Sequence, residues 1–365
     1  MTIYKDLKTT NRTIGSGIDV SSGTIKLDGN YPTGTGNVAL GDTALDDGSL
    51  SGANNTAIGS AALTVNTTGE KNTAVGKGSM TRNTTGKCNT GVGVDSFLFN
   101  TTGCQNTGVG NSSLAFNTTG ESNVAMGWKA LNSNTTADNN IAVGMSALAA
   151  NTTGANNTAV GYIALCANTT GSCNVAIGRD ALDSNTEGSS NVAVGTDTLQ
   201  ANTTGGSNIA IGDDALKGNS TASFNIGIGA TALQNNQTGT GNVAVGYQSL
   251  PSNTASNNTA VGFNSLCLNT TGTENVGIGK DVLKDNTSGA GNVAIGVEAL
   301  TNNTTASENV AVGKLAMFTN TTGGANTALG YQALRLNVSG ASNTAIGLCA
   351  LRANTGNNNT AVGTS

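Results

Sequence analysis

Residues 174–190 read NVAIGRDALDSNTEGSS, and residues 191–195 start the same unit again as NVAVG. The first Asn of this unit occurs twenty times between Asn37 and Asn359, and sixteen of the nineteen intervals are seventeen residues long. A fixed period of this length is typical of proteins built from stacked structural units, each of which contacts only its neighbours. We call each copy a rung and number its residues from position 1, the first Asn.

Three intervals depart from seventeen residues. The interval after Asn37 has eighteen residues, and the intervals after Asn242 and Asn343 have sixteen. Changes of one residue fit into a corner of a coil, so we expect the stack of rungs to continue through them.

Positions 2 to 5 of the rung predict a short strand that ends at a turn. Position 4 is apolar in every copy, position 3 is Ala or Gly, and position 5 is Gly from Gly41 to Gly363. Successive side chains of a strand point to opposite faces, so positions 2 and 4 share one face and position 3 lies on the other. A Gly repeated at one place indicates a positive φ angle or a close approach of two backbones.

The remaining positions complete a coil. Asn at positions 1 and 12 favours turns, and identical Asn side chains stacked on successive rungs can form a ladder of hydrogen bonds. Positions 12 to 14 suit a second extended piece, whereas positions 6 to 11, as in RDALDSN, are compatible with a strand or with one helical turn. The predicted fold class is all-β: a parallel β-solenoid or β-roll of about twenty 17-residue rungs, with a short helical turn per rung as an open alternative.

Composition agrees with a thin repetitive coil. In 365 residues, aromatic residues make up 3% and charged residues 10%, with a net charge of −5. Few large side chains exclude a thick hydrophobic core. The strict recurrence of Val, Ile and Leu argues against disorder, because disordered chains are poor in aliphatic residues.

Several function classes are disfavoured. The chain contains no His, the commonest general base and metal ligand, so we expect no enzyme activity, no catalytic residues, no cofactor and no metal. No basic cluster is present to bind nucleic acid, and no apolar run is long enough to insert in a membrane as a helix. The six cysteines are scattered and predicted to be reduced thiols, with Cys88 and Cys104 on neighbouring rungs best placed to oxidise.

A single thin coil has little apolar surface to bury inside itself. Each rung offers two large apolar side chains, at positions 4 and 9, against the backbone entropy of seventeen ordered residues. We therefore expect copies to associate side by side, with the small residues at position 3 allowing close approach. The prediction is a homotrimeric rod about 95 Å long, from twenty rungs spaced about 4.8 Å apart.

The strand motifs NVAIG (174–178), NVAVG (191–195) and NTAVG (157–161) resemble the head repeats of trimeric autotransporter adhesins of the YadA type. That resemblance covers residues 37–365 and implies a trimeric parallel β-roll. Repeats of this kind also resemble tail-fibre or appendage proteins of tailed phages, notably cyanophages. This second resemblance implies a structural fibre protein of a phage virion that mediates host attachment. The alternatives are the passenger fragment of a bacterial surface adhesin, at the cell surface, and an ice-binding solenoid with repeated Thr.

Two regions are candidates for contacts with partners. Residues 1–36 precede the repeats, contain the strand-like TIKLDGN (24–30), and are predicted to cap the first rung or dock onto other virion proteins. The start MTIYKDLKTT lacks the apolar stretch of a secretory signal, so we expect assembly in a host cytoplasm. Position 6 carries the rings that are candidate contacts with a host-surface glycan or protein, namely Trp128, Tyr162, Tyr247, Phe263 and Tyr331.

Overall fold

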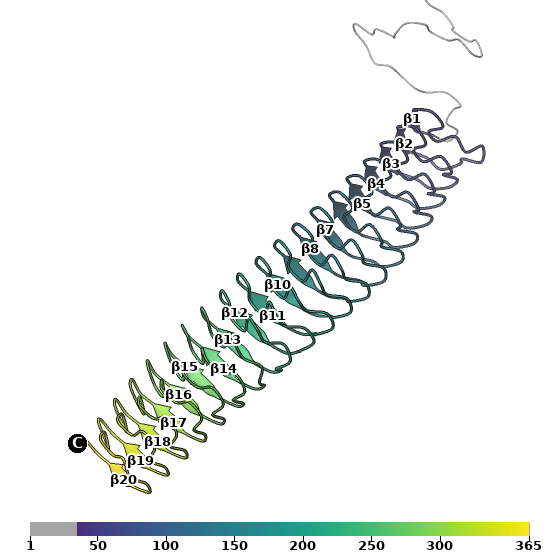
Figure 1. The fold of residues 1–365 in the computed structure, drawn as a ribbon. Helices are drawn as coiled ribbons and strands as arrows, with labels where there is room; N and C mark the ends of the chain where they lie inside the picture. Colours follow the sequence, from purple (N-terminus) through teal and green to yellow (C-terminus); the bar gives the residue numbers. More distant parts are fainter. Residues whose placement is uncertain (1–34, 365) are drawn as a thin grey trace, which may run out of the picture.

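The computed structural model describes residues 35–364, which form one straight stack of coils. The strand-like stretch predicted at 24–30 lies outside the described residues. Each rung contributes one three-residue strand, and the strands follow one another along the rod from the first rung to the last (Figure 1). The expected all-β parallel solenoid is confirmed. The domain boundary predicted at residue 36 falls at the start of the described part.

The twenty strands occupy positions 2 to 4 of the twenty rungs. They are β1 (Val38–Leu40), β2 (Thr56–Ile58), β3 (Thr73–Val75), β4 (Thr90–Val92), β5 (Thr107–Val109), β6 (Val124–Met126), β7 (Ile141–Val143), β8 (Thr158–Val160), β9 (Val175–Ile177), β10 (Val192–Val194), β11 (Ile209–Ile211), β12 (Ile226–Ile228), β13 (Val243–Val245), β14 (Thr259–Val261), β15 (Val276–Ile278), β16 (Val293–Ile295), β17 (Val310–Val312), β18 (Thr327–Leu329), β19 (Thr344–Ile346) and β20 (Thr360–Val362).

Every strand pairs in parallel with the next one in the chain, and equivalent positions face each other. Val192 of β10, for example, pairs with Ile209 of β11. The register also holds across the irregular rungs: Val38 pairs with Thr56 over eighteen residues, and Val243 pairs with Thr259 over sixteen. The extra or missing residue is therefore absorbed outside the strand, as the sequence predicted.

Positions 6 to 11 form two consecutive turns, so the alternative of a helical turn is wrong, and no helix occurs within residues 35–364. In the rung of β11 the N–H of Ala215 donates to the carbonyl of Gly212, and that of Asn219 donates to Leu216. Asp214 and Leu216 have φ angles of 56° and 51°, which a right-handed helix does not contain. Burying the Leu side chain gains roughly 1.5–3 kcal/mol, which offsets a left-handed cost of roughly 1–2 kcal/mol.

Positions 12 to 14 form a bend and not a second strand. Their backbone still joins successive rungs, because the N–H of Thr186 donates to the carbonyl of Thr203 at 3.0 Å. The Thr186 hydroxyl donates to the same carbonyl at 3.2 Å. Hydrogen bonding along the rod axis therefore continues outside the strands.

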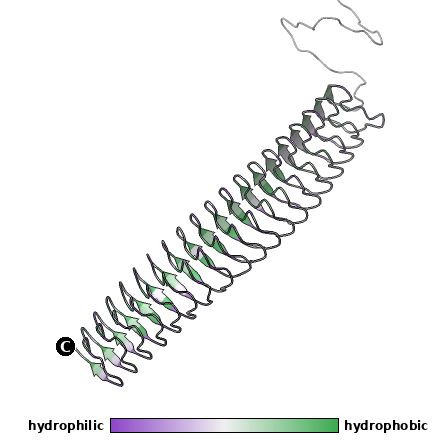
Figure 2. Cartoon of the chain, viewed as in Figure 1, coloured by the Kyte–Doolittle hydropathy of each residue, from purple (hydrophilic) through white to green (hydrophobic). Residues whose placement is uncertain are grey.

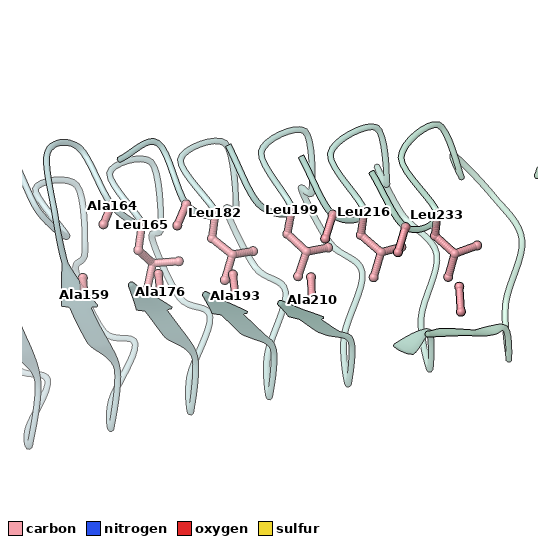
Figure 3. Close-up of a cluster of buried hydrophobic side chains, with 14 of the residues drawn as sticks. Ala159, Ala164, Leu165, Ala176, Leu182, Ala193, Leu199, Ala210, Leu216 and Leu233 are labelled. Carbon is pink, nitrogen blue, oxygen red and sulfur yellow. The ribbon is translucent and has the colours of Figure 1, made fainter. Parts of the chain in front are cut away.

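The interior of the coil is one side chain thick. The Leu residues at position 9 are fully buried and lie in a row along the rod axis, beside the small residues of positions 3 and 8 (Figure 3). Position 3 therefore faces the inside of its own coil. The prediction that position 3 forms a contact between copies is wrong, because the position 9 side chains already occupy the space that it faces.

The small residues at position 3 match the size of the interior side chains around them. A Cβ added to Gly108 would lie 2.5 Å from Cε2 of Phe97, and one added to Gly91 would lie 3.0 Å from Cε of Met80. Phe97 and Met80 are two of the residues that replace Leu at position 9. A larger interior side chain is thus accommodated by a Gly on the adjoining rung.

Two buried Asn side chains in each rung from β2 to β18 connect it to its neighbours. At position 1, Oδ1 of Asn174 accepts the backbone N–H of Asn191 at 3.0 Å, and Nδ2 donates to the carbonyl of Gly188 at 2.9 Å. At position 12, Nδ2 of Asn185 donates to Oδ1 of Asn168 at 2.8 Å and to the same Gly188 carbonyl at 3.0 Å. These amides satisfy polar groups that burial would otherwise leave unpaired.

The Gly at position 5 turns the chain where neighbouring backbones are closest. Gly178 has a φ angle of 140°. A Cβ placed on Gly178 would lie 2.2 Å from the carbonyl oxygen of Gly195 in the next rung. Both the backbone conformation and the lack of space restrict this column to Gly.

The amide ladder predicts a pH-dependent effect of Asn185→Asp. An ionised carboxylate cannot donate to Asn168 or Gly188, so at neutral pH the variant loses at least roughly 1–3 kcal/mol of stability. Burial raises the pKa of the new carboxyl in the folded state, so the protonated form is the stable one. The loss is therefore smallest below about pH 4, the unfolded pKa, and grows as pH rises. Thermal unfolding followed by circular dichroism from pH 3 to 8 measures it.

Asn235→Asp is the matched control, because Asn235 is an exposed Asn on the turn side of the rod. It should unfold at nearly the wild-type temperature across the same pH range. Equal, pH-independent effects of the two substitutions would contradict the role assigned to the ladder.

Candidate interaction surface

The outward face of the sheet, formed by the position 2 and position 4 side chains, runs the whole length of the rod. Position 3 points inward, so its two neighbours point outward, and the apolar strands form a continuous row on one side (Figure 2). Ile177, Ile211 and Ile228 at position 4 are 36–40% exposed. The expectation that position 4 contributes to the interior of a single coil is therefore wrong.

The size of this outward face follows from strand geometry. Twenty strands spaced about 4.8 Å apart, each of three residues rising about 3.3 Å, give a strip about 95 Å by 10 Å, or roughly 950 Å². A monomeric protein rarely exposes a contiguous apolar patch larger than a few hundred Å². A patch of this size is typical of a surface that another molecule covers.

The apolar character of the outward face varies along the rod. Position 4 is apolar throughout, but position 2 is Thr in β2 to β5 and in β18 to β20. From β9 to β13 both positions are aliphatic in every rung. The central rungs therefore present the most apolar surface.

The five rings predicted as contact residues all lie on the surface at position 6, two residues beyond the outward face. Trp128, Tyr162, Tyr247, Phe263 and Tyr331 are each 44–49% exposed. Tyr247 and Phe263 occupy adjacent rungs and stack with their ring centroids 5.5 Å apart. The structure does not bring the other three together, since Trp128 and Tyr162 are two rungs apart and Tyr331 lies near the C-terminal end.

A second aromatic stack lies at position 11, where no contact was predicted. Phe99 and Phe116 stack with centroids 5.1 Å apart, and the Arg82 guanidinium lies over Phe99 at 4.6 Å from its centroid. These three residues are spaced by seventeen, so the rung period alone places them in one column. Applying that period to every position, and not only to position 6, would have found the stack.

Charged side chains form a ladder across three rungs. Arg179 contacts Asp180 and lies 3.1 Å from the Asp197 carboxylate, while Nζ of Lys217 lies 3.0 Å from Asp197 and 2.9 Å from Asp214. The hydrogen bonds that Lys217 donates to Asp214 and then to Asp197 raise the pKa of Lys217. These charged side chains thus form a connected series of ion pairs that links neighbouring rungs.

The structure gives the repeated Thr and Asn residues roles inside the stack. The hydroxyl of Thr169, at position 13, donates to the carbonyl of Thr186 in the next rung at 3.0 Å. Asn168 begins one of the Asn-Thr-Thr triplets that match glycosylation sites, and it is fully buried. These groups are therefore engaged within the rod and are not offered to ligands.

Within residues 35–364, no cluster of three or more His, Cys, Asp or Glu side chains is arranged to bind a metal ion. The same part of the chain contains no helix with the length and apolar character needed to cross a bilayer. The surface feature that remains is the long outward face with the position 6 rings beside it.

The described residues place the chain in the class of β-solenoid repeat proteins, with one strand and about seventeen residues per turn. No protein-family model matches the chain, and no curated protein matches it.

The cysteines, all of which are thiols, should differ in reactivity. Cys88 and Cys173 are exposed. Burial raises the pKa of the Cys166 and Cys267 thiols, with a further contribution from Asp183 at Cys166. The thiolate is the reactive form, so iodoacetamide at pH 8 should modify Cys88 and Cys173 before Cys166 and Cys267. Peptide mass spectrometry over a time course gives the order, and simultaneous modification of all four would contradict it.

Proposed function

We propose that this chain is a non-enzymatic structural rod of a phage virion, a tail-fibre or appendage protein in which three copies pack side by side through their outward faces. The observation that carries the proposal is the apolar outward face, which extends over all twenty strands of the rod. A face that recurs on every rung suits a partner that is equally long and equally repetitive. Another copy of the same chain meets that requirement.

The area of the outward face supports association between copies. Its roughly 950 Å² per chain, divided between two neighbours in a trimer, compares with the about 800 Å² that each partner buries in an interface of standard size. Val and Ile predominate there, and since they are already partly buried in the single chain, each gains a part of the roughly 1.5–3 kcal/mol that full burial of an exposed side chain provides. The number three rests on the resemblance of the NVAIG-type motifs to the head repeats of trimeric adhesins.

In such a fibre the rod acts as a spacer about 95 Å long. Residues 1–36 dock it to other virion proteins, and side chains left exposed outside the contact between copies are available to a host-surface glycan or protein. Assembly takes place in the host cytoplasm, and the finished protein is part of the virion. A bacterial surface adhesin built on the same rod remains the alternative, at the cell surface. The ice-binding alternative is weaker, because the position 13 hydroxyls donate to backbone carbonyls.

The oligomeric state tests the role of the outward face. Light scattering after size exclusion should give about 108 kDa, three times 35.9 kDa, for an elongated particle. The triple substitution Ile177→Lys, Ile211→Lys and Ile228→Lys should reduce the mass to that of one chain, because three ammonium groups cannot be buried together between copies. Circular dichroism should stay unchanged, since these side chains lie outside the coil.

The matched control places three Lys residues on the Thr column at position 14, which is exposed on another side of the rod. It consists of Thr170→Lys, Thr204→Lys and Thr221→Lys. This control should keep the wild-type mass. A wild-type protein of one-chain mass would refute the proposed assembly.

The location of the protein tests its role in a virion. Mass spectrometry of purified phage particles should detect the chain, in a copy number that is a multiple of three per fibre. Recovery from the outer surface of bacterial cells, and not from particles, would support the adhesin alternative and contradict the virion proposal.

A further inference from the structure

A uniform repeat creates a problem for side-by-side assembly. Every strand carries Val, Ile or Thr at position 2 and Val, Ile, Leu or Met at position 4, and neighbouring strands are spaced about 4.8 Å apart. Two copies displaced by one rung would still have nineteen of their twenty strands facing each other. A displacement changes only which side chains of similar size meet, so the outward face distinguishes the aligned arrangement only weakly.

Position 6 is where the rod departs from uniformity next to that face. It carries a ring in the rungs of five strands and smaller or charged residues in most others. The rings are Trp128 (β6), Tyr162 (β8), Tyr247 (β13), Phe263 (β14) and Tyr331 (β18).

The spacing of these rings makes each displacement distinguishable. Counted in rungs, successive rings are separated by two, five, one and four. A displacement of five rungs aligns two rings with two others, and every other displacement aligns at most one. Only the aligned arrangement places all five rings in the same layers as their counterparts.

We propose that the five position 6 rings set the axial register between copies of this chain, an inference that rests on the proposed side-by-side assembly. In a closed cyclic assembly the copies are related by rotation, so equivalent residues lie in the same layer. Each ring is about half exposed in the single chain, which leaves it apolar surface to bury against a neighbour. Trp and Tyr are the residues that most often dominate protein interfaces.

The side chains near Trp128 and Tyr162 support this role. Met126 lies at position 4 in the rung of Trp128. The next rung, which precedes that of Tyr162, carries Ile141 at position 2 and Met145 at position 6. All five side chains are 42–49% exposed. Aromatic and Met side chains are enriched at the buried centres of interfaces. These side chains give three successive rungs, those of β6 to β8, exposed apolar surface beside the sheet.

Two of the four cations at position 6 carry a counter-charge of their own chain. Arg179 pairs with Asp180 and Asp197. Lys280 lies 3.5 Å from the Asp281 carboxylate. At these two rungs the aligned arrangement therefore brings together ion pairs and not bare cations.

Distances between spin labels measure the register. The full chain, with its six cysteines replaced by serine and a label attached through Thr204→Cys, should give one narrow distribution of distances between copies. Replacing all five rings with alanine should broaden it toward longer values, because each displaced rung adds about 4.8 Å along the axis. The control Phe99→Ala, Phe116→Ala and Phe224→Ala removes rings from other columns and should leave the distribution narrow.

A second variant keeps the interface area but changes the pattern, since every position 6 residue is moved by one rung. Alone, it should give the narrow distribution. Refolded together with the original chain, it should form mixed assemblies in which labels on the two kinds of chain are offset by one rung. Mixed assemblies without an offset, or an alanine variant that keeps the narrow distribution, would overturn the proposal. A labelled parent protein with one-chain mass would instead refute the assembly itself.

Discussion

The structure depends on the hydrogen-bonded ladders of buried Asn amides at positions 1 and 12. At position 12 the amide of Asn185 donates to the amide of Asn168 in the preceding rung, so this column needs an Asn at the same point of neighbouring rungs. At position 1 the amide oxygen of Asn174 accepts the backbone N–H of Asn191 in the next rung. A buried amide left unpaired is costly, and this cost prevents neighbouring rungs from slipping. All other columns follow from that alignment: Leu stacks on Leu, Gly on Gly, and the strands pair residue for residue.

Much of this architecture was predictable from the spacing of residues. The period placed every strand, the Gly at position 5 marked the turn, and the irregular intervals were correctly expected to leave the register intact. Which face of the strand points into the coil was not predictable. Alternation separates position 3 from positions 2 and 4, but small residues suit a narrow interior as well as a close contact between chains. The buried row of Leu side chains at position 9 decides between these, and its place was unknown until the turns were seen.

The turns themselves explain the other difference. Leu182 has a φ angle of 52°, a conformation that sequence patterns do not indicate for a residue with a branched side chain. The candidate surface was predictable to the same degree. The exposure of the position 6 rings was expected, whereas the stack of Phe99 and Phe116 depends on combining the rung period with column contacts. The outward face emerged only once position 3 was known to point inward.

The parallel, in-register pairing has a consequence for how such a chain evolves. Duplicating or deleting one seventeen-codon unit adds or removes a complete rung and leaves every buried column continuous. The length of the rod can therefore change in steps of about 4.8 Å without a new fold having to arise. Unequal recombination between near-identical repeats supplies such changes readily. Selection can then change the length of the rod without changing the stability of each rung.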